Sequence, residues 1–319
     1  MIEIPTVEDL DVKGKRVLVR ADLEFKDRES PRGNATDSIV AYLKKCGSAK
    51  IKLIGHKGIA EMYSWWDGVE VTYDIRADER ELENSIEMAE ELAVGWDIFV
   101  NESFAESHRE YTSVNALPKL MKSKNQPVCF GLRFKEEISN LSRVFINPKK
   151  PVLMIISGAK EDKLAYLESF VKFADKILVG GKLPEYKEKV EQVESFGRAR
   201  DKQVELVEKV ILADLVADKE DITIHSIEKF EEEIAKAGTI VVSGPLGKFE
   251  DEGHRQGTER IFRSVAKSSA YKIAGGGDTE AALAMFNITH KFDWVSVGGG
   301  AMLEFLTKGT LPGIEALLK

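Results

Sequence analysis

Hydrophobic positions along the chain form short runs that alternate with amphipathic helical patterns. Eight runs rich in β-branched residues predict strands, at residues 16–21, 50–56, 97–102, 151–157, 176–181, 240–244, 272–276 and 294–299. Between them, helical patterns occupy residues 38–47, 83–95, 164–174, 226–238 and 278–287. Within 226–238, Ile227, Phe230 and Ile234 share one face, and Gly238 is placed as a C-cap. Strands that are apolar throughout and separated by helices are typical of buried parallel strands in βα units.

The series of strands and helices occurs twice, before and after about residue 150, which predicts two domains. The length of 319 residues agrees, because one domain per ~150 residues is the usual expectation. Residues 132–151 have the pattern of a helix of three or more turns that ends before Asn147 and Pro148. We therefore predict an α/β protein with two parallel sheets, joined by a helix that acts as a semi-rigid connector.

Composition and charge narrow the classes of function. The chain is 43% hydrophobic and 31% charged, as in ordinary globular proteins, and its net charge of −8 argues against nucleic-acid binding. Cys46 and Cys129 are too few for a disulfide scaffold and too far apart for a zinc knuckle, which indicates buried thiols in a reducing compartment. The N-terminus lacks the order of a signal peptide, and no apolar run approaches the ~20 residues of a membrane span. We predict a cytoplasmic protein with no membrane partner.

Four glycine-containing motifs follow predicted strands of the second half, namely SGAKEDK (157–163), SGPLGKFE (243–250), GGGDT (275–279) and SVGGGA (296–301). Ligands of parallel sheets bind at the carboxyl ends of strands, and main-chain amides at helix starts favour anions. The motifs predict a phosphate or nucleotide site, with tight strand-to-helix turns as the alternative. Asp278 is suited to hold Mg²⁺, to cap its helix, or to do both. A Walker A loop is excluded because Phe249 follows Gly247 and Lys248, and the G-x-G-x-x-G fingerprint is missing.

Charged residues follow the strands of the first half. Each of these arginines alone is typical of a protein surface, but their repeated placement just past strands favours a basic cup for a small anion. The residues are Arg20, Asp22, His56, Arg76, His108 and Arg109.

Blocks of sequence spread from residue 11 to 317 resemble the phosphoglycerate kinase family, in the family's order. They are DVKGKRVLVRADLEF (11–25), DIFVNESFAESHREYTSV (97–114), NPKKPVLMIISGAKEDK (147–163), TIVVSGPLGKFE (239–250), IAGGGDTEAAL (273–283) and SVGGGAMLEFLTKGTLPGIEAL (296–317). The resemblance implies two Rossmann-like domains with a hinge cleft, and phosphoryl transfer between 1,3-bisphosphoglycerate and Mg-ADP to give 3-phosphoglycerate and Mg-ATP in glycolysis. It implies a triose-binding domain at 1–131 with a C-terminal return at 307–319, an interdomain helix at 132–150, a nucleotide-binding domain at 151–306, and a monomer.

The resemblance also implies roles for single residues. The triose would be held by Arg20, Asp22, His56, Arg76 and Arg109. Catalysis would involve Arg20 and Lys160, with Gly298, Gly299 and Gly300 beneath the transferred phosphoryl group. The nucleotide would be bound by Lys160 and Lys163 at its phosphates, Gly180 and Gly181 at the adenine, Glu250 at the ribose, and Gly275, Gly276, Gly277, Asp278 and Thr279 at the start of a helix. Asp278 would be the residue associated with Mg²⁺.

Several positions depart from the family pattern. Ser38 and Ile59 stand where the family has arginines, and Glu24 replaces an asparagine. The GAKEDK motif is one residue shorter than its family counterpart, which changes the reach of Lys163. An arginine that acts on a transferring phosphoryl group is worth roughly 10³–10⁵ in rate, so impaired activity is expected unless Arg32 or Lys57 supplies the charge. Two hypotheses follow: a phosphoglycerate kinase of reduced rate, or a related nucleotide-binding pseudoenzyme or kinase for another acid.

Overall fold

A computed structural model describes residues 5–159, 161–186 and 209–318 of the chain. The chain divides into two compact units: unit 1 comprises residues 1–139 and 308–319, and unit 2 comprises residues 140–307. Helix α4 (Leu132–Ser142) crosses this division. The sequence predicts boundaries at 131/132 and 306/307 and a helix within 132–150. The observed helix ends at Ser142, five residues before Asn147, which has a positive φ of 51°.

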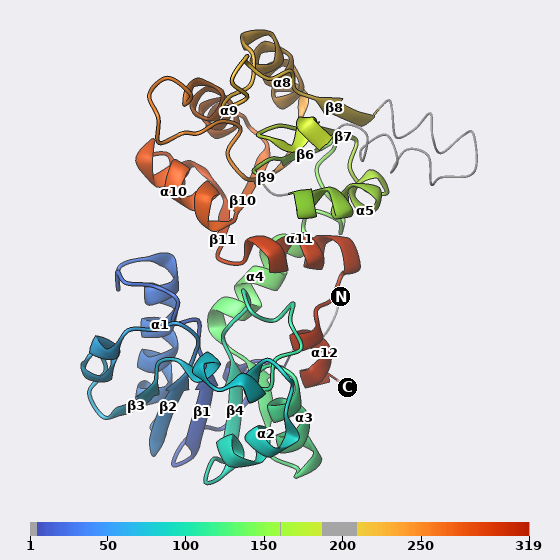
Figure 1. Cartoon of the computed structure of the whole chain (residues 1–319). Helices are drawn as coiled ribbons and strands as arrows, with labels where there is room; N and C mark the ends of the chain where they lie inside the picture. The colour runs from blue at the N-terminus through green and yellow to red at the C-terminus, as the bar shows by residue number, and fades with distance from the viewer. Residues whose placement is uncertain (1–4, 160, 187–208, 319) are drawn as a thin grey trace. The chain divides into compact units, whose positions relative to one another are not determined.

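Unit 1 contains a parallel sheet of five strands in the order β3-β2-β1-β4-β5. Figure 1 labels β3, β2, β1 and β4 in this order. The strands are β1 (Arg16–Arg20), β2 (Lys50–Ile54), β3 (Val69–Thr72), β4 (Ile98–Asn101) and β5 (Val128–Phe130). The longer helices are α1 (Pro31–Lys45), α2 (Ile86–Ala93), α3 (Ala116–Ser123) and α12 (Pro312–Leu318). The C-terminal helix α12 contacts α3 and β5, and Lys122 Nζ donates to the carbonyl of Leu318 at 3.0 Å.

Unit 2 contains a parallel sheet of six strands in the order β11-β10-β9-β6-β7-β8. The strands are β6 (Val152–Ile156), β7 (Lys176–Val179), β8 (Val210–Leu212), β9 (Thr239–Ser243), β10 (Tyr271–Gly275) and β11 (Trp294–Ser296). The helices are α5 (Leu167–Val171), α8 (Ile224–Lys236), α9 (Gln256–Lys267), α10 (Gly277–Met285) and α11 (Gly299–Lys308). Strands β6 and β9 are buried along their whole length, as their continuous apolar sequences predict.

The predicted fold class is confirmed, because both sheets are parallel and each of the eight predicted strands is present. The sequence pattern missed β3, β5 and β8, which have only three or four residues each. Helix α1 begins at Pro31, seven residues before the predicted start, with Ser30 as its N-cap accepting from Gly33 N. The pattern at 164–174 was predicted as one helix but forms part of a 3₁₀ helix, η5 (Glu161–Tyr166), followed by the short α5. The hinge cleft stays a prediction.

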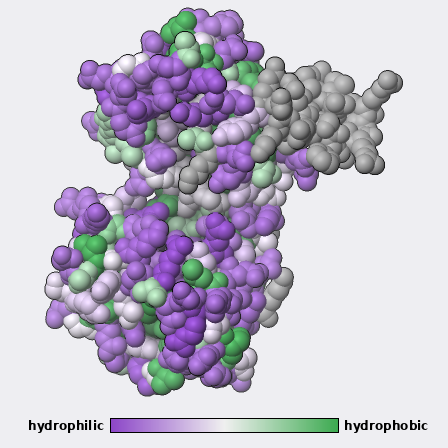
Figure 2. Space-filling model, viewed as in Figure 1, coloured by the Kyte–Doolittle hydropathy of each residue, from purple (hydrophilic) through white to green (hydrophobic). Residues whose placement is uncertain are grey.

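The surface is largely polar. On the face shown in Figure 2, hydrophilic residues dominate both units and hydrophobic side chains are scattered. The large exposed hydrophobic residues, such as Tyr63, Val94 and Ile224, belong to different elements. Within the described ranges, no helix combines the length and the apolar character needed to cross a membrane.

Candidate active site

Each sheet has a topological switch point, where the order of strands reverses. In unit 1 this point lies between β1 and β4, and in unit 2 between β6 and β9. Ligands of open parallel sheets bind in the crevice at the carboxyl ends of such strands. Arg20 ends β1, Ser243 ends β9 and Ser157 directly follows β6. The predicted motifs therefore converge on the switch point of each unit.

The guanidinium of Arg20 is the centre of the unit 1 site, and its side chain is fully buried. Its Nε donates to Ser113 Oγ at 2.8 Å, and its Nη1 donates to the carbonyl of Ala21 at 2.5 Å. Among the residues that the structure describes, its Nη2 has no hydrogen-bond partner. Arg20 is therefore held rigidly while one donor stays available.

His56 and Glu81 extend this arrangement into a buried network. His56 Nε2 lies 2.7 Å from Glu81 Oε1, and both side chains are buried. Glu81 also accepts from the hydroxyl and the amide of Ser113, at 2.6 and 3.0 Å. His56 Nδ1 lies 3.6 Å from Glu106 Oε2, which is beyond a normal hydrogen bond. We call Arg20, His56, Glu81 and Ser113 the Arg20 network.

Two carboxyl groups beside the Arg20 network have pKa values shifted in opposite directions, although the charge of Arg20 lowers both. Burial raises the pKa of Asp22, although the charges of Arg32 and Arg20 oppose this effect. Burial alone would also raise the pKa of Glu106, but His56 and the charges around it, including Arg20, lower it to about 2. Asp22 Oδ1 accepts from Arg32 Nη1 at 3.3 Å, whereas its buried Oδ2 has no partner in the described part of the chain.

Arg76 and Arg109 lie around this network with less burial. The Cζ atom of Arg76 lies 5.9 Å from the centroid of the Tyr111 ring, and that ring is 5.3 Å from the His56 ring. Arg109 is exposed, and its side chain makes no hydrogen bond or ion pair with described residues. The amide of Arg109 donates to the main-chain carbonyl of Glu106 at 3.0 Å. Arg109 therefore lies in the same turn of the chain as Glu106.

Ser38, Ile59 and Glu24, which depart from the family pattern, each make defined contacts with the rest of unit 1. Ser38 is exposed on α1, and its hydroxyl donates to the carbonyl of Asn34 at 2.7 Å. Ile59 packs against the hydrophobic core of unit 1. Glu24 Oε1 accepts from Lys57 Nζ at 2.7 Å, and Glu24 Oε2 lies 3.8 Å from Arg32 Nη1. The additional carboxylate is therefore paired locally, and Arg32 rather than Lys57 reaches Asp22.

Unit 2 contains a cavity of about 300 Å³ at the carboxyl ends of its strands. Three predicted nucleotide residues, Gly181, Glu250 and Asp278, line it, together with Gly158 and Ala159. Lys160, the neighbour of Ala159, lies outside the described residues. Four further charged residues line the cavity, Lys182, Lys219, Glu220 and Lys248. Lys248 belongs to the predicted motif at 243–250, although no role was predicted for its side chain. The other three belong to turns without periodicity, which give no signal in the sequence.

Lys163 lies at the switch point of unit 2. Its Nζ donates to the carbonyl of Ser157 at 2.6 Å and to the carbonyl of Ser243 at 3.2 Å, which joins the ends of β6 and β9. Burial lowers the pKa of Lys163 to about 8, although the nearby charge of Asp278 opposes this effect. The ammonium group lies close behind the Gly158 and Gly244 turns, because a Cβ atom added there would be 3.3 and 2.8 Å from Nζ.

The two triple-glycine motifs pack against each other. A Cβ atom on Gly299 would lie 2.8 Å from the Cα of Gly276, and Gly276 has a positive φ of 106°. On Gly275, a Cβ atom would lie 2.5 Å from Met302 Sδ. At Gly277, by contrast, an added Cβ atom meets nothing within 4 Å. Tight packing thus explains Gly275 and Gly299, and the positive φ explains Gly276, whereas the space at Gly277 is open to a ligand.

Other predicted residues serve the framework of this site. The hydroxyl of Thr279 accepts from Gly244 N at 2.8 Å and donates to the carbonyl of Gly275 at 3.0 Å. It therefore fixes the two turns against each other. Gly180 is buried, and a Cβ atom there would lie 3.0 Å from Leu246. Gly298, which directly precedes α11, is also buried, and its carbonyl accepts from Met302 N in the first turn of that helix.

A bound metal would depend on few protein ligands. No cluster of three or more histidine, cysteine, aspartate or glutamate residues within the described ranges is arranged to hold an ion. Asp278 is exposed in the first turn of α10 and lines the cavity. Mg²⁺ is usually bound by one or two carboxylates together with substrate phosphates and water, so a single carboxylate beside an anion site fits this ion.

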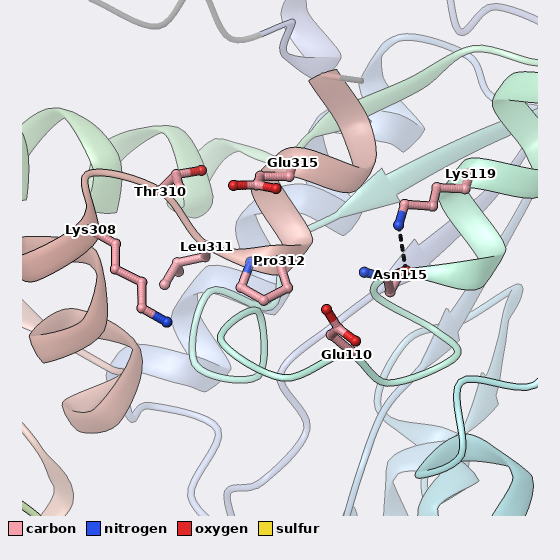
Figure 3. Close-up of a pocket in the computed structure, with 8 residues that line it drawn as sticks. All are labelled: Glu110, Asn115, Lys119, Lys308, Thr310, Leu311, Pro312 and Glu315. Atoms are coloured by element: carbon pink, nitrogen blue, oxygen red, sulfur yellow. Dashed lines mark hydrogen bonds between the residues drawn. The ribbon is translucent and has the colours of Figure 1, made fainter.

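A second cavity, of about 260 Å³, lies in unit 1 between the C-terminal segment and the residues that precede and begin α3. Figure 3 shows its lining, in which Lys119 is directed toward Asn115 and donates to its Oδ1 at 2.9 Å. Its other lining residues are Glu110, Lys308, Thr310, Leu311, Pro312 and Glu315. None of the residues predicted for substrate binding belongs to this set.

Comparison with known proteins identifies the class of enzyme. A family model described as phosphoglycerate kinase matches residues 37–219 and 193–309. The phosphoglycerate kinase of Borrelia hermsii is 30% identical over 402 residues, covering 100% of both chains, and that of Coxiella burnetii is 29% identical, covering 98% of this chain and 88% of the relative. The solved structure of the Coxiella enzyme has a TM-score of 0.80 and 26% identity, covering 99% of this chain and 98% of that chain.

The protein is thus a phosphotransferase with two parallel-sheet domains. More closely, the chain belongs to the phosphoglycerate kinase family, whose members bind small-molecule substrates. Family membership and the named relatives support phosphoglycerate kinase function. The resemblance predicted from the sequence is confirmed.

Proposed function

We propose that the chain transfers a phosphoryl group between 1,3-bisphosphoglycerate and Mg-ADP, with the triose held at the Arg20 network and the nucleotide in the cavity of unit 2. One observation carries the assignment of the triose site. Three of its five predicted residues have a buried polar atom without a hydrogen-bond partner among described residues: Arg20 Nη2, Asp22 Oδ2 and His56 Nδ1, the last of which lies 3.6 Å from Glu106 Oε2. Leaving such an atom unpaired costs about 1–3 kcal/mol, so a bound ligand is expected to supply the partners.

The chemistry of these three atoms fits a hydroxy acid. Arg20 Nη2 is a donor and requires an acceptor such as a carboxylate oxygen, whereas ionised Asp22 Oδ2 requires a donor such as a hydroxyl group. His56 Nδ1 can serve in either way, depending on its protonation. 3-Phosphoglycerate carries a carboxylate, a hydroxyl and a phosphate. Arg76 and Arg109 would bind its phosphate, and Arg32 adds positive charge beside Asp22.

In unit 2, main-chain amides at the starts of α10 and α11 would bind the nucleotide phosphates, with Lys163 close behind the turns of Gly158 and Gly244. Lys160 and Gly298, Gly299 and Gly300 keep their proposed place at the transferred phosphoryl group. Asp278 would hold Mg²⁺, which neutralises phosphate charge when bound. Gly181 and Glu250 would contact the nucleoside. The proposal includes a monomeric protein located in the cytoplasm.

The rate is expected to be reduced by the absence of two family arginines. Serine and isoleucine carry no charge, so neither Ser38, which is exposed, nor Ile59, which packs against the core, replaces an arginine. Arg32 lies beside Asp22 and supplies one cation near the triose site. We therefore expect triose binding to be retained better than the rate of phosphoryl transfer.

A coupled assay with 3-phosphoglycerate, ATP and Mg²⁺ tests the proposal. We expect turnover by the wild type and a decrease of at least about 10-fold in kcat/KM for nucleotide in Asp278→Ala, because metal neutralisation contributes several kcal/mol. Glu228→Ala, an exposed carboxylate on α8, is the matched control and should change activity less than about twofold. Calorimetric binding of Mg-ADP without turnover would instead indicate a nucleotide-binding pseudoenzyme or a different acid substrate.

A further inference from the structure

Two loops form one wall of the cavity in unit 2. The first, residues 213–223, lies between β8 and α8 and contributes Lys219 and Glu220 to the lining. The second, residues 244–255, lies between β9 and α9 and contributes Lys248, Phe249 and Glu250. We call them the 213–223 loop and the 244–255 loop. The width of the cavity depends on how these loops are held together.

The main chain provides part of the connection. Lys248 N donates to the carbonyl of Glu220 at 2.8 Å, which joins the tips of the two loops. At their bases, Gly257 N donates to Asp221 Oδ2 at 2.9 Å. The bond between Lys248 N and the carbonyl of Glu220 contains no titratable group. In the other bond the acceptor is the carboxyl group of Asp221, whose pKa is raised by burial.

A side chain, His254, provides the other connection. Its Nε2 lies 2.9 Å from Asp218 Oδ2 in the 213–223 loop, and its Nδ1 lies 3.1 Å from Asp251 Oδ2 in its own loop. Both aspartates accept hydrogen bonds and cannot donate when ionised. A neutral imidazole has only one donor, so it satisfies one aspartate and turns a lone pair toward the other. Only the doubly protonated ring forms both bonds.

The surroundings of His254 favour this charged form. Hydrogen bonds to Asp218 and Asp251, together with their negative charges, raise the pKa of His254. The charge of His254 in turn contributes to lowering the pKa of Asp218, Asp251 and Glu220. Lys248 is a cation on the same wall, and its charge also contributes to lowering the pKa of Asp251 and Glu220. A histidine whose pKa is raised keeps its bonds at low pH and loses them as the pH rises past its raised pKa, above the ordinary value of about 6.5.

We propose that His254 is a positioning residue for the nucleotide site, whose protonated ring ties the 213–223 loop to the 244–255 loop and thereby strengthens nucleotide binding at low pH. The inference deepens the proposed function and rests on nucleotide binding in this cavity. His254 does not line the cavity. It acts through Asp218 and Asp251 on the residues that do, and it is expected to affect the KM for nucleotide rather than kcat.

Calorimetric titration with Mg-ADP at pH 6 and pH 9, at constant free Mg²⁺, tests the proposal. Relative to wild type, His254→Gln is expected to raise the Kd about 3- to 10-fold at pH 6 and less than twofold at pH 9, because the doubly protonated ring is lost as the pH rises. Asp218→Asn should have a similar effect at pH 6, and the double variant should be no weaker than either single variant because the two residues share one bond. His225→Gln, an exposed histidine on α8, is the matched control and should match wild type at both pH values.

The outcomes separate this inference from the proposed function. If wild type binds no Mg-ADP, the nucleotide assignment fails and the inference fails with it. If wild type binds and His254→Gln binds equally well at pH 6, only the inference is overturned. An equal loss at both pH values also overturns it, because that result reports a general structural defect. A coupled assay should show a raised KM for nucleotide in His254→Gln, with kcat and the KM for 3-phosphoglycerate within about twofold of wild type.

Discussion

The candidate sites of the two units lie at equivalent places in their parallel sheets, but one is formed mainly by side chains and the other mainly by the main chain. In unit 1, buried side chains carry the site: Arg20 and His56 are held in place by Glu81 and Ser113. In unit 2, glycine turns and helix starts carry it, and the half-buried Lys163 lies close behind the turns of Gly158 and Gly244. A site made of side chains needs partners that fix each charge, whereas a site made of main chain needs the absence of side chains.

This difference predicts how each unit tolerates substitution. Removal of a buried charge in unit 1 leaves its partners unpaired, so stability and binding should fall together. Substitutions at the glycines of unit 2 should separate the two properties, because some glycines are required by packing and Gly277 is not.

Arg20→Ala should have the largest effect. The fully buried guanidinium has Asp22 and Glu106 among the acids that its charge affects, and its removal leaves buried negative charge uncompensated. We expect a decrease of about 10²- to 10³-fold in kcat/KM for 3-phosphoglycerate and a loss of about 3–5 kcal/mol in the free energy of unfolding. Coupled assays and urea denaturation measure the two effects.

Arg28→Ala is the matched control for Arg20→Ala. Arg28 is an exposed arginine of the same unit, with a salt bridge to Asp37 at 2.9 Å. Its loss should change stability by less than about 1 kcal/mol and activity by less than about twofold. If Arg20→Ala lowered activity without lowering stability, the idea that unit 1 couples the two properties would be wrong.

Lys163→Met should have an intermediate effect that depends on pH. The pKa of Lys163 is lowered to about 8, so its charge is present below that pH and is lost as the pH rises through it. We expect Mg-ADP affinity in wild type to fall roughly tenfold from pH 7 to pH 9, and Lys163→Met to bind about 10- to 100-fold more weakly at pH 7. The stability of the protein should change in the opposite direction. Burial of the charged ammonium group costs free energy, so the free energy of unfolding of wild type should increase as the pH rises from 8 to the ordinary lysine pKa of 10.5.

Lys267→Met, an exposed lysine at the end of α9, is the control for Lys163→Met and should retain the wild-type pH dependence of binding. An unchanged pH profile in Lys163→Met would mean that another group titrates. In that case Lys163 would serve only to join the ends of β6 and β9.

The same contrast explains what the sequence predicts and what it does not. Strand ends are visible in the hydrophobic pattern: Arg20 is the last residue of β1, and Asp278 lies in the first turn of the helix that follows β10. The groups that fix the unit 1 charges are not visible: Glu81 lies in a 3₁₀ helix and Ser113 in a loop, 61 and 93 residues from Arg20. Three-dimensional proximity of such segments has no periodic signal. The pattern also missed β5 and β8, which have three residues each, although it found β11, which is equally short.

Glycine motifs present the opposite difficulty, because their position is easy to predict and their purpose is not. Two explanations, close packing and phosphate binding, apply to the same letters. The surroundings of each residue separate them: Gly299 approaches the backbone of Gly276, while Gly277 faces open space. Fold and motif positions therefore follow from the sequence. Which glycines are required by packing and which face open space depends on distances that only the structure provides.

Gly277→Ala and Gly299→Ala form the most discriminating pair, although their effects are small. Alanine at 277 meets no protein atom and occupies the first position of α10 with an ordinary φ, so the free energy of unfolding should rise by about 0.5–1 kcal/mol. Its methyl group would enter the space proposed for phosphate and should weaken Mg-ADP binding about 3- to 10-fold. Alanine at 299 would lie 2.8 Å from the Cα of Gly276 and should destabilise unit 2 by about 1–3 kcal/mol. Thermal unfolding measures the changes in stability, and calorimetry measures the changes in Mg-ADP affinity. If Gly277→Ala bound Mg-ADP as tightly as wild type, the triple glycine would serve only as a tight turn.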